Sequence, residues 1–251
     1  TVSAESADLN KTVYSNDGGS WNTVASTEKL GTIEGSVTLG ENTTVKGNST
    51  LTADDNIAIG NNSVITGNTA ADGVISAGGQ ISIGDGTQVL DNTATSDGKA
   101  AINLADGQTL YIGSGAILSG NTSNGVSGSV QAGQNTQINV YTDATAYTFI
   151  NDGISTTAAA SLAADQTVMT KTGAGTLVYG GTGTTDTFGG TYQQLEGNLI
   201  IGHATFGAVD PATGKVGPLQ SIDGAVMGTD DTVYDIRTGQ VTLAKNSTMK
   251  G

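Results

Sequence analysis

Four segments of the chain repeat one pattern of apolar and polar positions. Each reads apolar, any residue, apolar, glycine, then a second apolar residue, then asparagine followed by serine or threonine; the segments are 37–49, 57–69, 81–93 and 110–122. The spacing from the glycine to the asparagine is constant, whereas the spacing from the asparagine to the next glycine varies. A constant part joined to a variable part indicates a unit that stacks on its neighbours and a loop that emerges on one face.

Alternation of apolar and polar residues predicts short strands within each unit. We expect the apolar pair before the glycine to point into the core, the glycine to turn the chain, and the next apolar residue to fill a second side of the core. The pairs are Val37/Leu39, Ile57/Ile59, Ile81/Ile83 and Leu110/Ile112, the glycines are Gly40, Gly60, Gly84 and Gly113, and the second set is Val45, Ile65, Val89 and Leu118.

The repeated asparagines are predicted to form a ladder. They would lie one above another at a corner of the stack, where side-chain amides can hydrogen-bond along the axis and support the stacked strands. They are Asn48, Asn68, Asn92 and Asn121.

Repeats of about 20 to 29 residues with two or three short strands are typical of a parallel β-helix, and a leucine-rich repeat would need a Leu-rich consensus that this chain lacks. The predicted fold class is therefore all-β, a right-handed parallel β-helix with three short strands per coil. Coils stack at about 4.8 Å, so roughly 11 coils would make a rod of about 50 to 55 Å.

We expect one β-helix over residues 1–251. Residues 1–35, which include Tyr14 and Trp21, would cap the first coil. Residues 36–150 would form coils with variable loops, and residues 203–251 would form further coils.

Three segments carry more specific expectations. Residues 240–251 repeat residues 36–47, with Ala244 at the turn glycine, and the chain stops within that unit, which predicts a fragment of a longer solenoid. The Ala-rich segment 155–165 could be a short helical turn or an ordered loop. Residues 205–225, with Pro211 and Pro218, could be a loop insertion or a distorted coil.

The composition supports many short strands joined by tight turns. Glycine accounts for 38 of 251 residues, proline for only 2, and aromatic residues for 4%. The formal charge of −14, from 9 basic and 23 acidic residues, argues against nucleic acid and anionic lipid as partners. The chain has no cysteine, so neither disulfides nor thiolate–metal sites can form. No apolar run approaches 18 residues, so we expect this part of the protein not to insert into a membrane.

Residues 168–202 resemble the passenger-associated repeat of bacterial autotransporters. The matching positions are Lys171, Thr172, Gly173, Gly175, Thr176 and Leu177, then Gly189, Gly190, Thr191 and Tyr192, then Gly197, Asn198 and Leu199. The four upstream units also resemble the repeats of polymorphic outer-membrane autotransporters, with Val45, Ile65, Val89 and Leu118 where those repeats usually carry phenylalanine.

The resemblance implies a β-helical passenger, displayed at the bacterial surface or secreted through a separate outer-membrane barrel. Such passengers serve in adhesion, cell–cell self-association and biofilm formation. We therefore expect a non-enzymatic adhesin whose partner is another copy on a neighbouring cell, or a host surface protein or glycan. The alternatives are a glycan-binding or glycan-cleaving β-helix and a passive stalk.

The sequence does not favour a catalytic or a metal site. His203 is the only histidine, and no Gly-Asp-Ser-Gly string accompanies it, so a serine protease triad is not expected. The acidic pairs Asp54–Asp55 and Asp230–Asp231 are not expected to form a catalytic pair of carboxylates, because adjacent side chains on a strand point to opposite faces. We expect them to be solvated turn residues. Residues 180–188 approach a calcium-binding nonapeptide but occur as one copy. We expect no cofactor and no metal.

Overall fold

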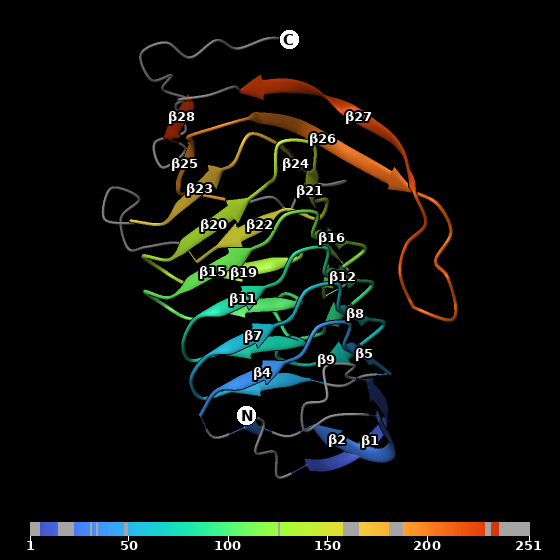
Figure 1. The fold of residues 1–251 in the computed structure, drawn as a ribbon. Helices are drawn as coiled ribbons and strands as arrows, with labels where there is room; N and C mark the ends of the chain where they lie inside the picture. The colour runs from blue at the N-terminus through green and yellow to red at the C-terminus, as the bar shows by residue number, and fades with distance from the viewer. Residues whose placement is uncertain are drawn as a thin grey trace.

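The structure, a computed structural model, describes residues 6–14, 23–30, 32–33, 35–47, 50–124, 126–157, 166–180, 188–228 and 232–235. These residues form an all-β parallel solenoid of about five turns (Figure 1). The predicted parallel β-helix is confirmed, with fewer turns in the described residues than the roughly 11 expected from coil spacing. The coils have three main sheets, named A, B and C here, and a minor sheet D.

Sheet C contains the first strand of each coil. Its parallel strands are β4 (Val37–Leu39), β7 (Ile57–Ile59), β11 (Ile81–Ile83), β15 (Thr109–Ile112), β20 (Gln137–Tyr141), β23 (Val168–Thr172) and β25 (Thr191–Gln194). β28 (Thr232–Asp235) pairs antiparallel with β25.

Sheet A contains the second strand of each coil. Its parallel strands are β5 (Thr44–Lys46), β8 (Val64–Thr66), β12 (Gln88–Leu90), β16 (Ile117–Ser119), β21 (Tyr147–Ile150), β24 (Thr176–Tyr179) and β26 (Asn198–Phe206). Antiparallel strands extend the sheet at both ends: β1 (Ser6–Tyr14) lies between β5 and the edge strand β2 (Thr23–Leu30), and β27 (Leu219–Gly228) pairs with β26 at the other edge.

Sheet B closes each coil. It contains β3 (Thr32–Ile33), β6 (Leu51–Ala53), β10 (Ile75–Ala77), β14 (Ile102–Leu104), β19 (Val130–Ala132) and β22 (Ile154–Thr156). Sheet D lies between A and B and contains β9 (Thr69–Ala70), β13 (Thr93–Ala94), β17 (Thr122–Ser123) and the antiparallel β18 (Val126–Ser127).

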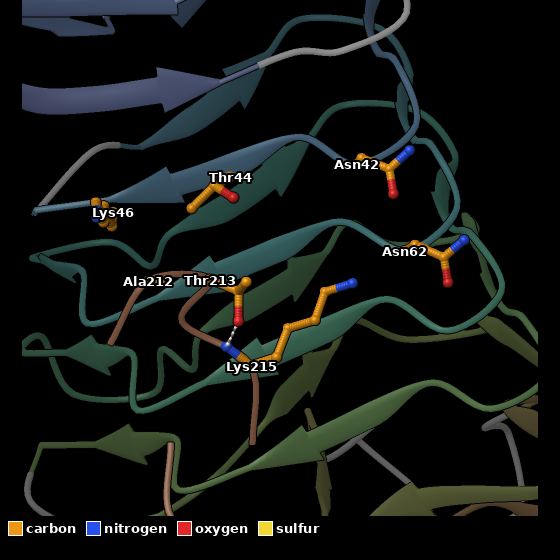
Figure 2. A pocket seen from close by; sticks show the side chains of 7 residues that line it. All are labelled: Asn42, Thr44, Lys46, Asn62, Ala212, Thr213 and Lys215. Atoms are coloured by element: carbon orange, nitrogen blue, oxygen red, sulfur yellow. Dashed lines mark hydrogen bonds between the residues drawn. The ribbon is translucent and has the colours of Figure 1, made fainter. Parts of the chain in front are cut away.

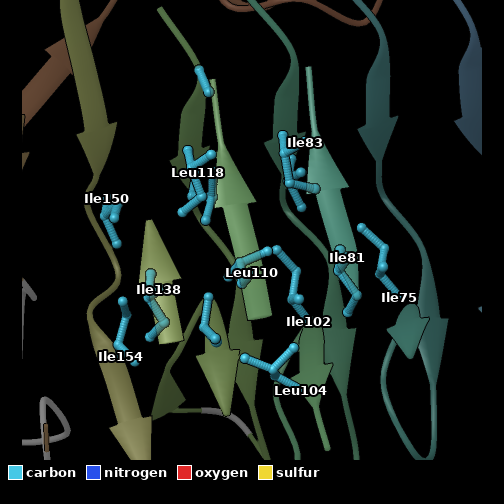
Figure 3. Packing of buried hydrophobic residues seen from close by; sticks show 14 of the residues in the cluster. Ile75, Ile81, Ile83, Ile102, Leu104, Leu110, Leu118, Ile138, Ile150 and Ile154 are labelled. Atoms are coloured by element: carbon cyan, nitrogen blue, oxygen red, sulfur yellow. The ribbon is translucent and has the colours of Figure 1, made fainter. Parts of the chain in front are cut away.

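The core is built from stacks of equivalent residues, as predicted. Ile57 pairs in register with Val37 on one side and Ile81 on the other, and Ile81 pairs with Leu110. All eight residues of the predicted first set and all four of the second set are buried. Figure 3 shows the resulting stacks of isoleucine and leucine side chains inside the coils.

The loops of variable length lie at the corner between sheets A and B. They connect β8 to β10, β12 to β14 and β16 to β19, whereas the turn between sheets C and A keeps one length in the first four coils. The repeated turn glycine is needed there because coils approach closely: a Cβ on Gly60 would lie 2.5 Å from the backbone carbonyl carbon of Gly40. The predicted constant unit and variable loop are therefore confirmed.

The asparagine ladder is confirmed for the three members that the structure describes. The Asn92 side-chain oxygen accepts hydrogen bonds from the backbone and side-chain nitrogens of Asn68, at 3.1 and 3.0 Å, and Asn121 receives the same pair from Asn92. Asn48 lies outside the described residues. Asp152 extends the ladder by one more residue, because its carboxylate accepts hydrogen bonds from the backbone and side-chain nitrogens of Asn121. The sequence repeat does not predict this position.

The expectation of further coils after residue 203 is wrong for the described part of that segment. β26 pairs with β24 as a coil strand at first, but β27 then pairs antiparallel with β26, so residues 198–228 form a long β-hairpin (Figure 1). The segment 205–225 is part of this hairpin. Trp21, residues 158–165 of the Ala-rich segment and the repeat at 240–251 lie outside the described residues. At the other end, Tyr14 at the end of β1 pairs with Thr44 of β5.

Candidate functional site

The outward surface of the seven parallel strands of sheet C, called the C face here, contains no charged residue. Alternation places one set of side chains of each parallel strand in the core and the other set outside. The only charged residue in the seven parallel strands is Lys171, which is fully buried. The C face consists of Thr38, Ala58, Ser82, Thr109, Tyr111, Gln137, Asn139, Tyr141, Val168, Thr170, Thr172, Thr191 and Gln193.

The Lys171 ammonium is bound inside the solenoid. It donates to the backbone oxygens of Thr172 at 2.9 Å, Gly173 at 2.5 Å and Glu196 at 3.2 Å. Because these carbonyls belong to the turns of two successive coils, the buried cation joins the coils. It is the lysine of the motif that resembles the passenger-associated repeat, and its place in the fold is structural.

Tyrosines give the C face its largest exposed side chains. Tyr111 is 43% exposed and Tyr141 is 48% exposed. The Tyr141 hydroxyl donates to the Asp143 carboxylate at 2.8 Å. This hydrogen bond is the main cause that raises the pKa of Tyr141, and the negative charge of Asp143 is the second. The C face can therefore offer hydroxyls, amides and aromatic rings to a partner, and the Asp143 carboxylate lies beside it at Tyr141.

The outward surface of sheet A is covered by the hairpin β26–β27. Outward apolar residues of four successive coils form a second core against it, with Ile200, Phe206, Val216 and Ile222 of the hairpin packed on them. The Phe206 ring meets the Phe149 ring edge to face, with centroids 5.0 Å apart. The buried members of this cluster are Leu90, Ile117, Phe149, Val178 and Ala204.

Hydrogen bonds fix the hairpin to the coils at two levels. The Asn151 side chain donates to the backbone oxygen of Ala204 at 2.8 Å and accepts from its backbone nitrogen at 2.9 Å. Further down, the Val216 backbone nitrogen donates to the Gln88 side-chain oxygen at 2.9 Å. We call residues 202–222, which lie along the side of the solenoid in Figure 1, the arm.

The turn of the arm, residues 210–215, is ordered by its own side chains. Asp210 accepts from the backbone nitrogen of Ala212 at 2.9 Å and from the Thr213 hydroxyl at 3.0 Å, and these bonds lower the pKa of its carboxyl. Gly214 has a φ of 73°, which favours glycine, and a Cβ there would lie 3.1 Å from the Thr66 methyl. The turn therefore rests directly on β8.

A polar groove of about 420 Å³ lies where the arm turn meets the first coils. Figure 2 shows its lining side chains, with Lys215 extending from the arm towards Asn62. The lining residues are Asn42, Thr44, Lys46, Asn62, Ala212, Thr213 and Lys215.

Sheet B presents a narrower outward surface than sheet C. Its parallel strands are two or three residues long, and loops fold onto it: Asn103 is buried, with its side-chain nitrogen donating to the backbone oxygens of Asp72 at 2.9 Å and Ala100 at 2.8 Å. Of the three main faces, the C face is therefore the least covered by the residues that the structure describes.

Within the part of the chain that the structure describes, Asp54, Asp55 and His203 do not form a common site. Asp54 and Asp55 are exposed in the turn between β6 and β7. His203 pairs across the hairpin with Asp223, and its buried Nδ1 has no hydrogen-bond partner. Asp230, Asp231 and residues 181–187 lie outside the described residues, and within those described no three His, Asp or Glu side chains are grouped so that they could hold a metal ion.

Comparison with protein-family models, with curated proteins and with solved structures found no match for the chain. The part of the chain that the structure describes has no helix of the length and apolar character needed to span a membrane.

Proposed function

We propose that the chain is the surface-displayed passenger of a bacterial autotransporter and acts as an adhesin, through self-association of copies on neighbouring cells. The observation that carries the self-association is the uncharged C face, over which no described segment folds. The resemblance of residues 168–202 to the passenger-associated repeat supports the surface location.

The charge distribution favours a second copy as the partner. With a net charge of −14, two copies repel one another wherever their acidic turns meet. The strands of the C face contribute no outward charge, so two such chains can approach there with their acidic groups confined to the flanking turns. Its hydroxyl and amide groups can both donate and accept, so the same surface can complement itself across a two-fold axis.

Avidity makes weak contacts sufficient. Each hydrogen bond between exposed side chains contributes little by itself, but many passengers on two facing cells bind together once the first pair has met. This mode needs no catalytic group, cofactor or metal.

A glycan on a host surface is the second candidate partner. The exposed rings of Tyr111 and Tyr141 favour it, because aromatic faces can pack on the apolar side of sugar rings while neighbouring amides bind sugar hydroxyls. The difference between the two partners is testable, since only self-association requires the C face on both cells.

The test is to display the passenger on non-adhesive bacterial cells and to measure their sedimentation. A C-face variant carries Ser82→Asp, Asn139→Asp and Thr170→Asp. A matched control carries Thr52→Asp, Ser76→Asp and Gln131→Asp, at equivalent outward positions of sheet B. Both variants add three negative charges.

We expect wild-type and control cells to settle together and C-face variant cells to stay dispersed. Mixing labelled wild-type cells with variant cells should exclude the variant from the aggregates. Wild-type cells that remain dispersed, or a control variant that disperses equally, would contradict self-association through the C face. Urea unfolding of both purified variants checks that the coils are intact.

A further inference from the structure

Acidic turns border the C face on both sides. In the part of the chain that the structure describes, the turns that lead into sheet C and out of it contain seven exposed acidic residues and no basic residue. We call these residues the acidic borders. They are Asp54, Asp55 and Asp106 on the side of sheet B, and Glu41, Asp85, Asp143 and Glu196 on the side of sheet A.

The charges of the acidic borders are not compensated within the molecule. None of the seven carboxylates forms an ion pair with a residue that the structure describes. The loops between sheets A and B differ, because they contain Lys99 besides their acidic residues. The borders therefore present uncompensated negative charge beside the surface that we propose for self-association.

Hydrogen bonds hold several of these carboxylates in place. Asp85 accepts from the backbone nitrogen of Ser114 in the next coil at 2.8 Å, and Asp106 accepts from that of Gln134 at 2.8 Å. Asp143 accepts from a tyrosine hydroxyl of the C face itself. Because their oxygens are bound to the coils, these carboxylates are not free to turn away when a second molecule approaches.

The border on the side of sheet A repeats with every second coil. Its acidic residues follow the first, third, fifth and seventh parallel strands of sheet C, and Asn61, Ser114 and Ala174 occupy the same place in the coils between them. Two coils span about 9.6 Å. This spacing is close to the Debye length of about 10 Å at 0.1 M salt and well below that of about 30 Å at 0.01 M. The charges of one border therefore act together at low salt and nearly separately at physiological salt.

We propose that ionic strength regulates self-association through the C face, with the acidic borders as the repulsive element; this inference rests on the proposed function. Two sheets that pack face to face lie about 10 Å apart, so the borders of two copies come within about the same distance of each other. At that distance one pair of like charges in water weakens association roughly twofold at low salt, and screening removes most of this effect at about 0.15 M. The molecule then stays apart from its copies in dilute medium and associates with them at physiological salt.

The test is sedimentation equilibrium of the purified chain at about 10 mM and about 150 mM NaCl, which bracket the change in screening. A border variant carries Asp85→Asn, Asp106→Asn and Asp143→Asn, which remove three charges and keep a side-chain oxygen as an acceptor. A matched control carries Asp72→Asn, Asp97→Asn and Asp223→Asn, which remove three exposed charges from the A–B loops and the hairpin.

We expect the association constant of the wild-type chain to rise at least about fivefold from the lower to the higher salt concentration. The border variant should associate at least about threefold more tightly than wild type at the lower concentration and should depend less on salt, whereas the control should differ from wild type by less than about twofold. Clumping of uncharged beads coated with each chain makes the same comparison with many copies, so that weak contacts are also measured. Urea unfolding should show similar stability for both variants.

An association constant that does not change with salt, or that falls as salt is added, would overturn the proposal, and a fall would indicate attractive ionic contacts. An equal gain in the control would also overturn it, because the net charge and not the borders would then set the repulsion. Beads that stay dispersed with all three chains at both salt concentrations would contradict the proposed self-association itself, and this inference with it.

Discussion

Sheets A and C are built in the same way and end with different surfaces. In both, strands of three to five residues stack in parallel register along the coils, β26 alone being longer. On the parallel strands of sheet C the outward residues are uncharged and mostly polar, and no described segment folds over them. On sheet A they include Ile117, Phe149 and Val178, and a segment from the end of the described chain folds back to cover them. The outward side of a solenoid strand can thus be surface or core, depending on a segment far away in sequence.

We expect the largest difference between the outward surfaces of sheets A and C when an aspartate is placed on each and the free energies of unfolding are compared. Val178→Asp puts a carboxylate into the cluster under the arm, where Val178 is fully buried. We expect a loss of about 3 to 5 kcal/mol in the free energy of unfolding, because a buried charge without a partner is strongly destabilising. Thr170→Asp on the C face should change stability by less than about 0.5 kcal/mol. Urea titration measures both, and similar losses would mean that the C face is covered too.

Replacing one asparagine on each sheet gives a second comparison of the two surfaces. Asn151→Ala leaves the backbone nitrogen and oxygen of Ala204 without their partners, so we expect a loss of about 2 to 3 kcal/mol and faster proteolysis of the arm. Asn139→Ala on the C face removes an outward side chain and should cost less than about 0.5 kcal/mol. An arm that resists protease equally in both variants would show that these bonds do not hold it.

A smaller effect of opposite sign is expected where sheet A turns into the loops. Asp91 has a φ of 52°, a conformation that Gly67 and Gly120 adopt at the equivalent positions of the neighbouring coils. Burial also raises the pKa of the Asp91 carboxyl, so its ionised form is disfavoured there. Asp91→Gly should raise the free energy of unfolding by about 0.5 to 1 kcal/mol. A decrease would show that the side chain contributes a contact that outweighs the strain.

The smallest effect concerns pH. Burial raises the pKa of Asp152 above its ordinary 3.8, although hydrogen bonds from Asn121, Ser129 and Gly120 oppose the shift. The folded chain therefore holds this proton to a higher pH than the unfolded chain does. Stability from this group is greatest below the ordinary pKa and falls as the pH rises through the folded value, then stays constant.

Comparison with Asp152→Asn isolates this contribution from the other carboxyl groups. The stability of the wild-type chain relative to the variant should fall as the pH is raised from about 4. Urea unfolding at a series of pH values measures the difference. A difference that stays constant or rises would mean that the pKa of Asp152 is not raised in the folded chain.

The coils could be predicted from the repeat because every coil buries equivalent apolar positions against its neighbours. Strict alternation, as in the Ile57–Ile59 strand, indicates one buried face, and the register of equivalent residues follows from it. The sequence also contains a pattern that indicates the covered outward surface of sheet A. Adjacent apolar residues such as Leu90 after Val89 and Leu118 after Ile117 indicate strands buried on both sides, whereas the repeat pattern alone predicts only Val89 and Leu118 in the core.

The arm and the groove could not be read in the same way. Residues 198–206 look like one more coil strand, and only the direction of the strand that follows makes them half of a hairpin. The turn Asp210–Lys215, with its proline and glycine, was a local signal for a hairpin. The groove is lined both by coil residues such as Asn62 and by arm residues such as Lys215, and no periodicity in the sequence relates an arm residue to a coil.

The arm also changes how the molecule can unfold. A solenoid in which each coil contacts only its neighbours can lose its terminal coils one at a time, and its stability is nearly a sum of local terms. Here Val216 is bonded to Gln88 in the third coil while the arm emerges from the last coil strand of sheet A. We expect the arm to dock last during folding, since its contacts need both ends of the stack, and to make distant coils open together. Hydrogen exchange would then show similar protection at β8 and β24, where an arm-free solenoid would show a gradient.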